Sequence, residues 1–139
     1  MDLGEIKTVS QWIIEDELVD FLDISLWDWF KMPEDPLYQE QSLLSHIVEI
    51  NKKDTRLTVA GKIINGVDVL EVMNTGVDFV TIGRSAILHH DFPLKIQKNK
   101  DFKAFIPPVS YDYLHREGLS DKFISYMKRW PNFVEEPSN

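Results

Sequence analysis

The fold is decided by two similar stretches of sequence, LTVAGKI at residues 57–63 and FVTIGR at residues 79–84. Each is a short apolar run that ends in a glycine followed by a basic residue. Runs of this length closed by glycine are typical of buried parallel strands. The two glycines, Gly61 and Gly83, are 22 residues apart, the spacing of one strand and its following helix. The stretches therefore predict two neighbouring parallel strands joined by a helix.

The residues between the two stretches fit that helix. Asn65 can cap it, and the aspartate at position 68 would favour its first turn through the helix dipole. Apolar residues at positions 67, 70 and 73 form one stripe. Gly76 stands where a left-handed residue would end the helix.

The same alternation continues on both sides. Upstream, residues 21–26 (FLDISL) predict a strand, and residues 43–50 predict an amphipathic helix of about three turns. Residues 31–38 contain two prolines and are predicted to be a loop. Downstream, residues 85–89 would begin another helix. This order predicts right-handed βαβ units and a parallel sheet, although three strands leave apolar edges and one face uncovered.

Composition limits the classes of function. The chain has 139 residues, 43% of them hydrophobic, which suits one soluble globular domain. Its formal net charge is −8, and no basic cluster interrupts the acidic balance. Because nucleic acid would be repelled at long range, we expect no nucleic-acid partner.

The absence of cysteine excludes disulfides, thiolate metal sites and a cysteine nucleophile. Residues 1–7 lack the basic and then apolar order of a signal peptide, and no apolar run approaches the roughly 18 residues of a membrane span. We therefore expect a cytoplasmic protein without a membrane partner.

Both glycine turns would lie at the carboxyl edge of the sheet, where ligands of parallel sheets bind. Gly61 and Gly83 would let backbone N–H groups approach a phosphate, and Arg84 can form a forked pair with phosphate oxygens. From spacing alone a glycine after a strand is more often a tight turn. A phosphate site and two plain turns therefore both remain open at this point.

Longer motifs give a family resemblance. The runs TVAGKI (58–63), GVDFVTIGRSA (76–86) and DFP (91–93) resemble the last two strand units of Old Yellow Enzyme-type NADH:flavin oxidoreductases. Residues 21–28 look like the sixth strand of that family and its loop, and the tail is similar to its C-terminal segment. The resemblance covers nearly the whole chain but only about the last third of the family.

The resemblance implies an α/β fold that is a partial TIM (β/α)8 barrel, made of about the last three βα units (strands six to eight) plus a C-terminal helical tail. Residues 1–104 would form the barrel units and residues 105–139 a helical extension packing on them. In the tail, Ser110 and Ser120 can cap two helices. A face formed by residues 123, 127 and 130 (Phe, Met and Trp) is predicted to dock the second helix.

By the same resemblance, the FMN phosphate would be bound by Gly61, Lys62, Gly83 and Arg84, with Lys62 contributing mainly its backbone N–H. The parent activity would be reduction of an activated, enone-like alkene by hydride from FMN, which NAD(P)H reloads. The strands and groups that hold the flavin ring and substrate in the family are absent, so the chain is truncated relative to it. No residue here is predicted to be catalytic, and the isolated chain is expected to hold little flavin.

Two other functions stay open. The chain could be an assembly element, forming a homo-oligomer or pairing its open edges with a complementing N-terminal barrel part. It could also bind phosphate ligands without any redox role. Neither requires a complete flavin site.

Other polar and aromatic residues suggest sites less strongly. His89, His90 and Asp91 are adjacent on an expected helix, where neighbours point about 100° apart, so we predict a solvated helix end and no metal site. His46 and Glu49 are three positions apart on an expected helix, where they would either pair or share an exposed face, and we favour the exposed face. The tryptophans at positions 27 and 29 follow the first strand and would either approach the ligand or pack against the rim.

Overall fold

A computed structural model describes residues 2–136, and the chain forms two compact units. The first unit contains the residues up to Ile63 together with Val67–Gly83. The second contains Ile64–Gly66 and the residues from Arg84 onward. Residues 84–104, which the sequence assigns to barrel units, thus lie in the second unit.

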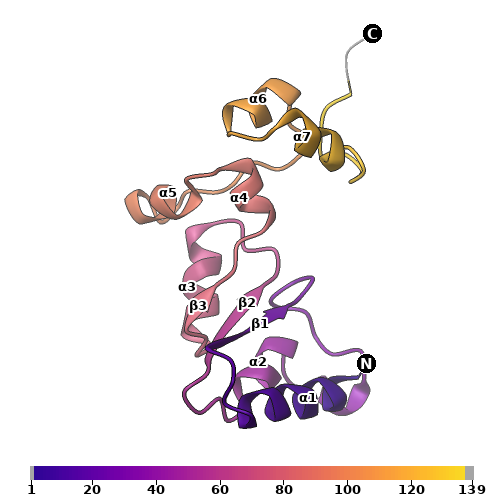
Figure 1. Cartoon of the computed structure of the whole chain (residues 1–139), viewed down its shortest axis with the longest axis vertical. Helices are drawn as coiled ribbons and strands as arrows, with labels where there is room; N and C mark the ends of the chain where they lie inside the picture. Colours follow the sequence, from indigo (N-terminus) through magenta and orange to yellow (C-terminus); the bar gives the residue numbers. More distant parts are fainter. Residues whose placement is uncertain (1, 137–139) are drawn as a thin grey trace. The chain divides into compact units, whose positions relative to one another are not determined.

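The first unit has the predicted alternation of helices and parallel strands (Figure 1). In chain order its elements are α1 (Leu3–Glu15), β1 (Phe21–Ser25), the 3-10 turn η1 (Pro36–Tyr38), α2 (Leu43–Val48), β2 (Arg56–Ala60), α3 (Gly66–Asn74) and β3 (Phe79–Val80). α2 is shorter than predicted. α3 ends before Gly76, whose φ of 108° is the left-handed conformation expected there.

The three strands form one open parallel sheet in the order β1-β2-β3. The register aligns Asp23 with Thr58 and Thr58 with Phe79. The Thr81 N–H donates to the Val59 carbonyl at 3.0 Å, so backbone pairing continues past the end of β3. Within residues 2–136 the sheet does not close into a barrel.

The hydrophobic core of the first unit lies on one face of this sheet. It combines strand residues with residues of α1, α2 and α3, and its buried members are Leu3, Leu44, Ile47, Leu57, Val59, Ile63, Val72 and Val77. The opposite face carries Phe21 and Phe79, which contact each other edge to face with ring centroids 5.7 Å apart. These rings are 54% and 36% exposed, so the second face keeps apolar surface in water.

Helix α1 is absent from the sequence predictions, although its start carries a recognisable signal. The Asp2 side chain accepts from the Glu5 N–H at 2.8 Å, and Glu5 accepts from the Asp2 N–H at 2.9 Å. This reciprocal capping box satisfies backbone donors that the first helical turn cannot.

The second unit is helical within the described residues (Figure 1). It contains α4 (Arg84–Leu88), α5 (Phe92–Lys98), α6 (Tyr111–Arg116) and α7 (Asp121–Met127). The predicted caps are confirmed: Ser110 accepts from the Tyr113 N–H, and Ser120 accepts from the Phe123 N–H. Its main core cluster comprises Leu88, Val109, Leu114, Ile124, Met127, Phe133 and Val134.

The predicted docking face of α7 is only partly correct. Met127 is buried, but Phe123 and Trp130 are 40% and 45% exposed. Ile124, which is fully buried, packs in their place. The helix is therefore rotated so that positions 124 and 127, rather than 123 and 130, face the core.

No helix within residues 2–136 has both the length and the apolar content needed to cross a bilayer.

Candidate phosphate-binding turns

The turns that follow β2 and β3 lie at the same edge of the sheet. β2 and β3 are hydrogen-bonded neighbours and run parallel, so their carboxyl ends point the same way. Gly61 directly follows β2, and Gly83 follows the extension of β3 through Thr81. Three of the four predicted phosphate contacts, Gly61, Lys62 and Gly83, thus belong to one edge of the first unit. Arg84 belongs to the second unit.

Gly61 is required by the backbone of a neighbouring loop. A Cβ at this position would lie 2.8 Å from the Leu26 oxygen and 2.9 Å from the Trp29 nitrogen. The loop is held there by two backbone bonds: Leu26 N–H donates to the Ala60 carbonyl at 2.7 Å, and Trp29 N–H donates to the Gly61 carbonyl at 3.2 Å. Close packing alone therefore explains this glycine.

Lys62 has an ionic partner that the sequence predictions missed. Its Nζ lies 2.9 Å from Oδ2 of Asp28, whose side chain is only 10% exposed. The other carboxylate oxygen of Asp28 accepts from the Phe30 N–H at 3.3 Å. In the sequence Asp28 stands between two tryptophans, three residues after β1 ends, and this local pattern does not identify Lys62 as its partner. The Lys62 charge is thus already compensated, which leaves its backbone N–H as the group available to an anion.

The backbone of Lys62 is unusual for a residue with a side chain. Its φ is 50°, in the left-handed region that costs a non-glycine residue about 1 kcal/mol or more. Such conformations concentrate at ligand-binding and switch segments. This turn therefore combines a crowded glycine with a strained lysine.

Gly83 has the opposite environment. A methyl group at this position would meet no heavy atom within 4 Å, and the residue is exposed. Packing therefore does not require a glycine here. Arg84, the next residue, begins α4 and is also exposed.

Asp78, within the GVDFV motif, has a structural role. Its Oδ2 accepts from the Leu57 N–H at 2.7 Å and from Lys52 Nζ at 2.5 Å, and its own N–H donates to the Leu57 carbonyl at 2.8 Å. The backbone N–H of Leu57, followed by Lys52, lowers the pKa of Asp78. The motif that carries much of the resemblance thus holds β3 in register beside β2.

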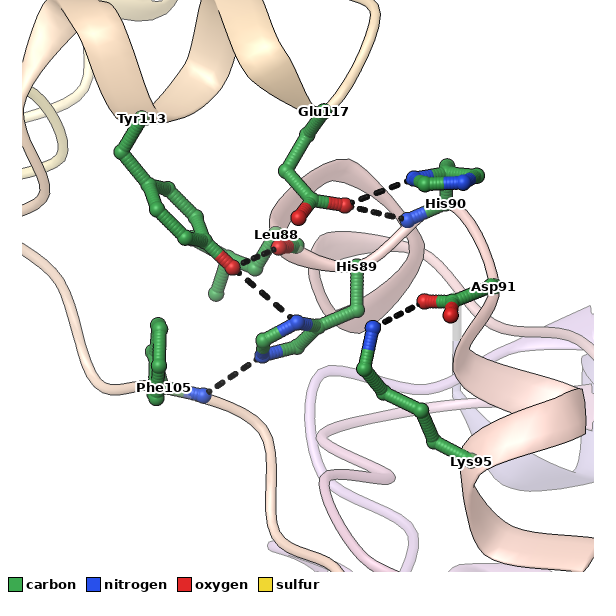
Figure 2. A network of polar contacts seen from close by, with 8 residues as sticks. All are labelled: Leu88, His89, His90, Asp91, Lys95, Phe105, Tyr113 and Glu117. Carbon is green, nitrogen blue, oxygen red and sulfur yellow. Dashed lines mark hydrogen bonds and ion pairs between the residues drawn. The ribbon is translucent and has the colours of Figure 1, made fainter.

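The predicted solvated helix end at His89 is wrong. His89 is 2% exposed and is enclosed by the rings of Phe102, Phe105 and Tyr113. Figure 2 shows a hydrogen bond at each ring nitrogen. The Phe105 N–H donates to Nε2 at 3.1 Å, so the neutral ring carries its proton on Nδ1 and donates it to Tyr113 Oη at 3.0 Å.

This chain of bonds ends on the backbone of α4. Tyr113 Oη donates to the Leu88 carbonyl at 2.7 Å. Burial lowers the pKa of His89 below its ordinary value, and burial together with Glu117 raises the pKa of Tyr113 to about 12. Both groups are therefore neutral near pH 7 and join α4, α6 and residue 105.

His90 agrees with the predicted solvated position. Its side chain is 65% exposed, and both its N–H and its Nδ1 contact Glu117 Oε2, at 3.0 and 2.8 Å (Figure 2). Burial pushes the pKa of Glu117 up, but the bonds from His90 outweigh it and the pKa is lowered. His90, Asp91 and Glu117 bring their ligand atoms within 4.8 Å of one another. Lys95 Nζ already pairs with Asp91, so this cluster is explained by internal ion pairs.

His46 and the two tryptophans after β1 also differ in how far they are buried. The prediction of an exposed His46 is wrong: it is 8% exposed, and its Nε2 lies 2.8 Å from the Tyr38 carbonyl oxygen. The alternative of a contact with Glu49 is present, because His46 Nδ1 lies 4.0 Å from Glu49 Oε2. Trp29 packs against the core, whereas Trp27 is 70% exposed.

No protein-family model matches this chain, and no curated protein is significantly similar to it.

Proposed function

We propose that this chain supplies the flavin-phosphate half-site of an Old Yellow Enzyme-type barrel, with β1, β2 and β3 as strands six to eight. The observation that carries the proposal is the pair of turns at Gly61 and Gly83, which follow neighbouring parallel strands at one sheet edge. That edge is where parallel sheets bind ligands. The sequence around both turns also resembles the family.

The residues present suit a phosphate but not a whole flavin. Gly83 leaves open the space that a side chain would fill, so an anion could approach the backbone there. The adjacent Arg84 can form two parallel bonds to phosphate oxygens. Lys62 would offer its backbone N–H while its side chain neutralises Asp28. We assign no residue of this chain to the flavin ring or to substrate.

Bound FMN would supply hydride for the reduction of an enone-like electrophile and would be reloaded by NAD(P)H. This chain's residues would hold and orient the phosphate end, which contributes only part of the binding energy. We therefore expect the isolated chain to bind FMN weakly. We also expect a cytoplasmic setting, and because the formal charge is −8 we expect no nucleic-acid partner.

The test compares ligands that differ only in the phosphate. Titration with FMN, riboflavin and inorganic phosphate, followed by flavin fluorescence, should show weak FMN binding that phosphate displaces and little riboflavin binding. Arg84→Ala should weaken FMN binding about tenfold, equivalent to 1.4 kcal/mol. Lys122→Ala, at an exposed position of α7, serves as the matched loss of charge. Equal binding of FMN and riboflavin would overturn the proposed phosphate contact.

A second candidate is an assembly role without redox activity. The exposed Phe21 and Phe79 rings and the open sheet favour it, since a parallel sheet normally has both faces covered. Purified chain that stays monomeric over a wide concentration range, alone and with a complementing barrel part, would contradict this role. Binding of simple sugar phosphates as tightly as FMN would instead indicate a phosphate binder with no flavin function.

A further inference from the structure

The free edge of β1 presents unpaired backbone groups in a defined pattern. On the β2 side, the Asp20 carbonyl accepts from Arg56 N–H and the Leu26 N–H donates to the Ala60 carbonyl. Residues of a parallel strand alternate in the side to which they hydrogen-bond, so the even-numbered positions face β2. The N–H and C=O groups of Phe21, Asp23 and Ser25 therefore point away from β2. Within residues 2–136, no strand pairs with that side.

This edge lacks most of the usual protection against pairing with another chain. Such edges are normally protected by lysine, proline, a bulge or a covering segment. β1 is five residues long, contains neither lysine nor proline, and pairs with β2 in unbroken register. Apolar side chains flank it: Leu18 is 86% and Trp27 70% exposed. The edge is thus open and bordered by apolar surface.

The one protective feature near β1 is negative charge, which is concentrated in residues 2–30. Residues 2–30 contain eight acidic side chains and a single lysine, a formal charge of −7 against −8 for the whole chain. Five of these acids fall within residues 15–23, and all five are exposed: Glu15, Asp16, Glu17, Asp20 and Asp23. Glu17 forms an ion pair with Lys53. Exposed acidic side chains therefore precede β1, and Asp23 lies within it.

We propose that the free edge of β1 binds a basic, extended segment of another protein, which adds to the sheet as a fourth strand. Backbone pairing at Phe21, Asp23 and Ser25 would supply the general affinity, and the acids of residues 15–23 would select lysine or arginine on the incoming segment. A second copy of this chain fits poorly, because joining two β1 edges brings two copies of the exposed acids of residues 15–23 together. This inference does not use the phosphate contact, but in a completed barrel strand five would pair with the same edge of β1, so a basic segment and strand five would exclude each other.

The test uses two synthetic peptides with opposite charge. One alternates valine and lysine over about eight residues, the ordinary length of a strand. The other has glutamate in place of lysine. Alternate N-methylation along one edge of both peptides prevents their own aggregation. Hydrogen exchange of the full chain, followed amide by amide by NMR, reports where each peptide binds.

The lysine peptide should slow exchange at Phe21, Asp23 and Ser25 at least about tenfold, which is 1.4 kcal/mol of added protection. The amides of Leu22 and Ile24, which already face β2, should change little. The protection should weaken as salt is raised. Equal protection by the glutamate peptide, or no protection with either peptide in excess, would refute the inference. So would concentration-dependent self-association that protects the same amides without peptide, because the occupant would then be a second copy.

Variants separate edge pairing from folding. Ser25→Pro removes an outward-facing N–H that the β1–β2 pairing does not use, so it should abolish peptide protection while leaving the sheet intact. Ser25→Ala keeps the donor and should bind as the original chain does. Asp23→Asn should retain pairing but weaken the preference for the lysine peptide. If Ser25→Pro retained full peptide protection, β1 would not be the pairing edge.

Discussion

The turns at Gly61 and Gly83 look alike in sequence but differ in the structure. Both follow a parallel strand and precede a basic residue. A side chain at Gly61 would collide with the backbone of Leu26 and Trp29, whereas one at Gly83 would meet no atom within 4 Å. The same local pattern thus arises once from packing and once without any packing requirement.

This difference changes the weight of the phosphate evidence. Contacts within the protein account for both residues of the first turn, because Gly61 leaves room for the loop of residues 26–29 and Lys62 pairs with buried Asp28. The second turn has no such structural explanation for Gly83. The proposal of a phosphate contact therefore depends more on Gly83 and Arg84 than on Gly61 and Lys62.

The largest expected effect is on the crowded turn. Gly61→Ala places a methyl group 2.8 Å from a backbone oxygen, so the loop of residues 26–29 must move or the bonds to it must break. We expect a loss of about 1–3 kcal/mol in the free energy of unfolding, measured by chemical denaturation. A change below about 0.5 kcal/mol, the ordinary range of surface substitutions, would show that the loop yields freely and that the crowding does not matter.

The sequence predicted elements well where local pattern and tertiary environment agree. The apolar runs of β1 and β2 and the serine caps of α6 and α7 each have a local signal, and each was found. The same local signals could not distinguish His89 from His90, because the residues that bury His89 lie 13 to 24 positions farther along the chain. For the same reason the Asp28–Lys62 pair, which joins two strand-end loops, was not predicted.

The second-largest expected effect is on Asp28, which lies in the loop of residues 26–29 that packs against Gly61. Asp28→Ala removes the partner of Lys62 and the acceptor for the Phe30 N–H. We expect a loss of about 1.5 kcal/mol, since bonds to charged groups contribute roughly 1.5–3 kcal/mol and Lys62 is half exposed. Asp28→Asn, which can still accept from Phe30, should lose less. Equal losses for the two variants would show that the charge contributes nothing.

In the second unit, the adjacent residues His89 and His90 show a similar contrast, since His89 is buried and His90 is exposed. Burial lowers the pKa of His89, aided by Lys95 and opposed by Glu117 and Asp91. The unfolded chain therefore binds more protons as the pH falls below the ordinary value of 6.5. The contribution of His89 to stability is complete above that value and is lost as the pH falls through the folded pKa.

Thermal unfolding measured from neutral pH to well below 6.5 reports this loss of stability. His89→Gln should be less stable at neutral pH but should show a smaller drop on acidification. His90→Gln, at the exposed neighbour, should keep the drop of the original chain. If His90→Gln instead removed it, the acid sensitivity would arise from the contact between His90 and Glu117 rather than from the buried ring.

The smallest stability effect should be at the open turn, and it completes the comparison. Gly83 is not in the left-handed region and has room for a methyl group, so Gly83→Ala should leave the free energy of unfolding unchanged or raise it by about 0.4–1 kcal/mol. If the open space receives a phosphate, the same methyl group would obstruct it, and FMN binding should weaken about tenfold although the fold is no less stable. An alanine variant that keeps both stability and FMN affinity would mean that neither packing nor phosphate requires this glycine, and the family resemblance at Gly83 would carry no binding role.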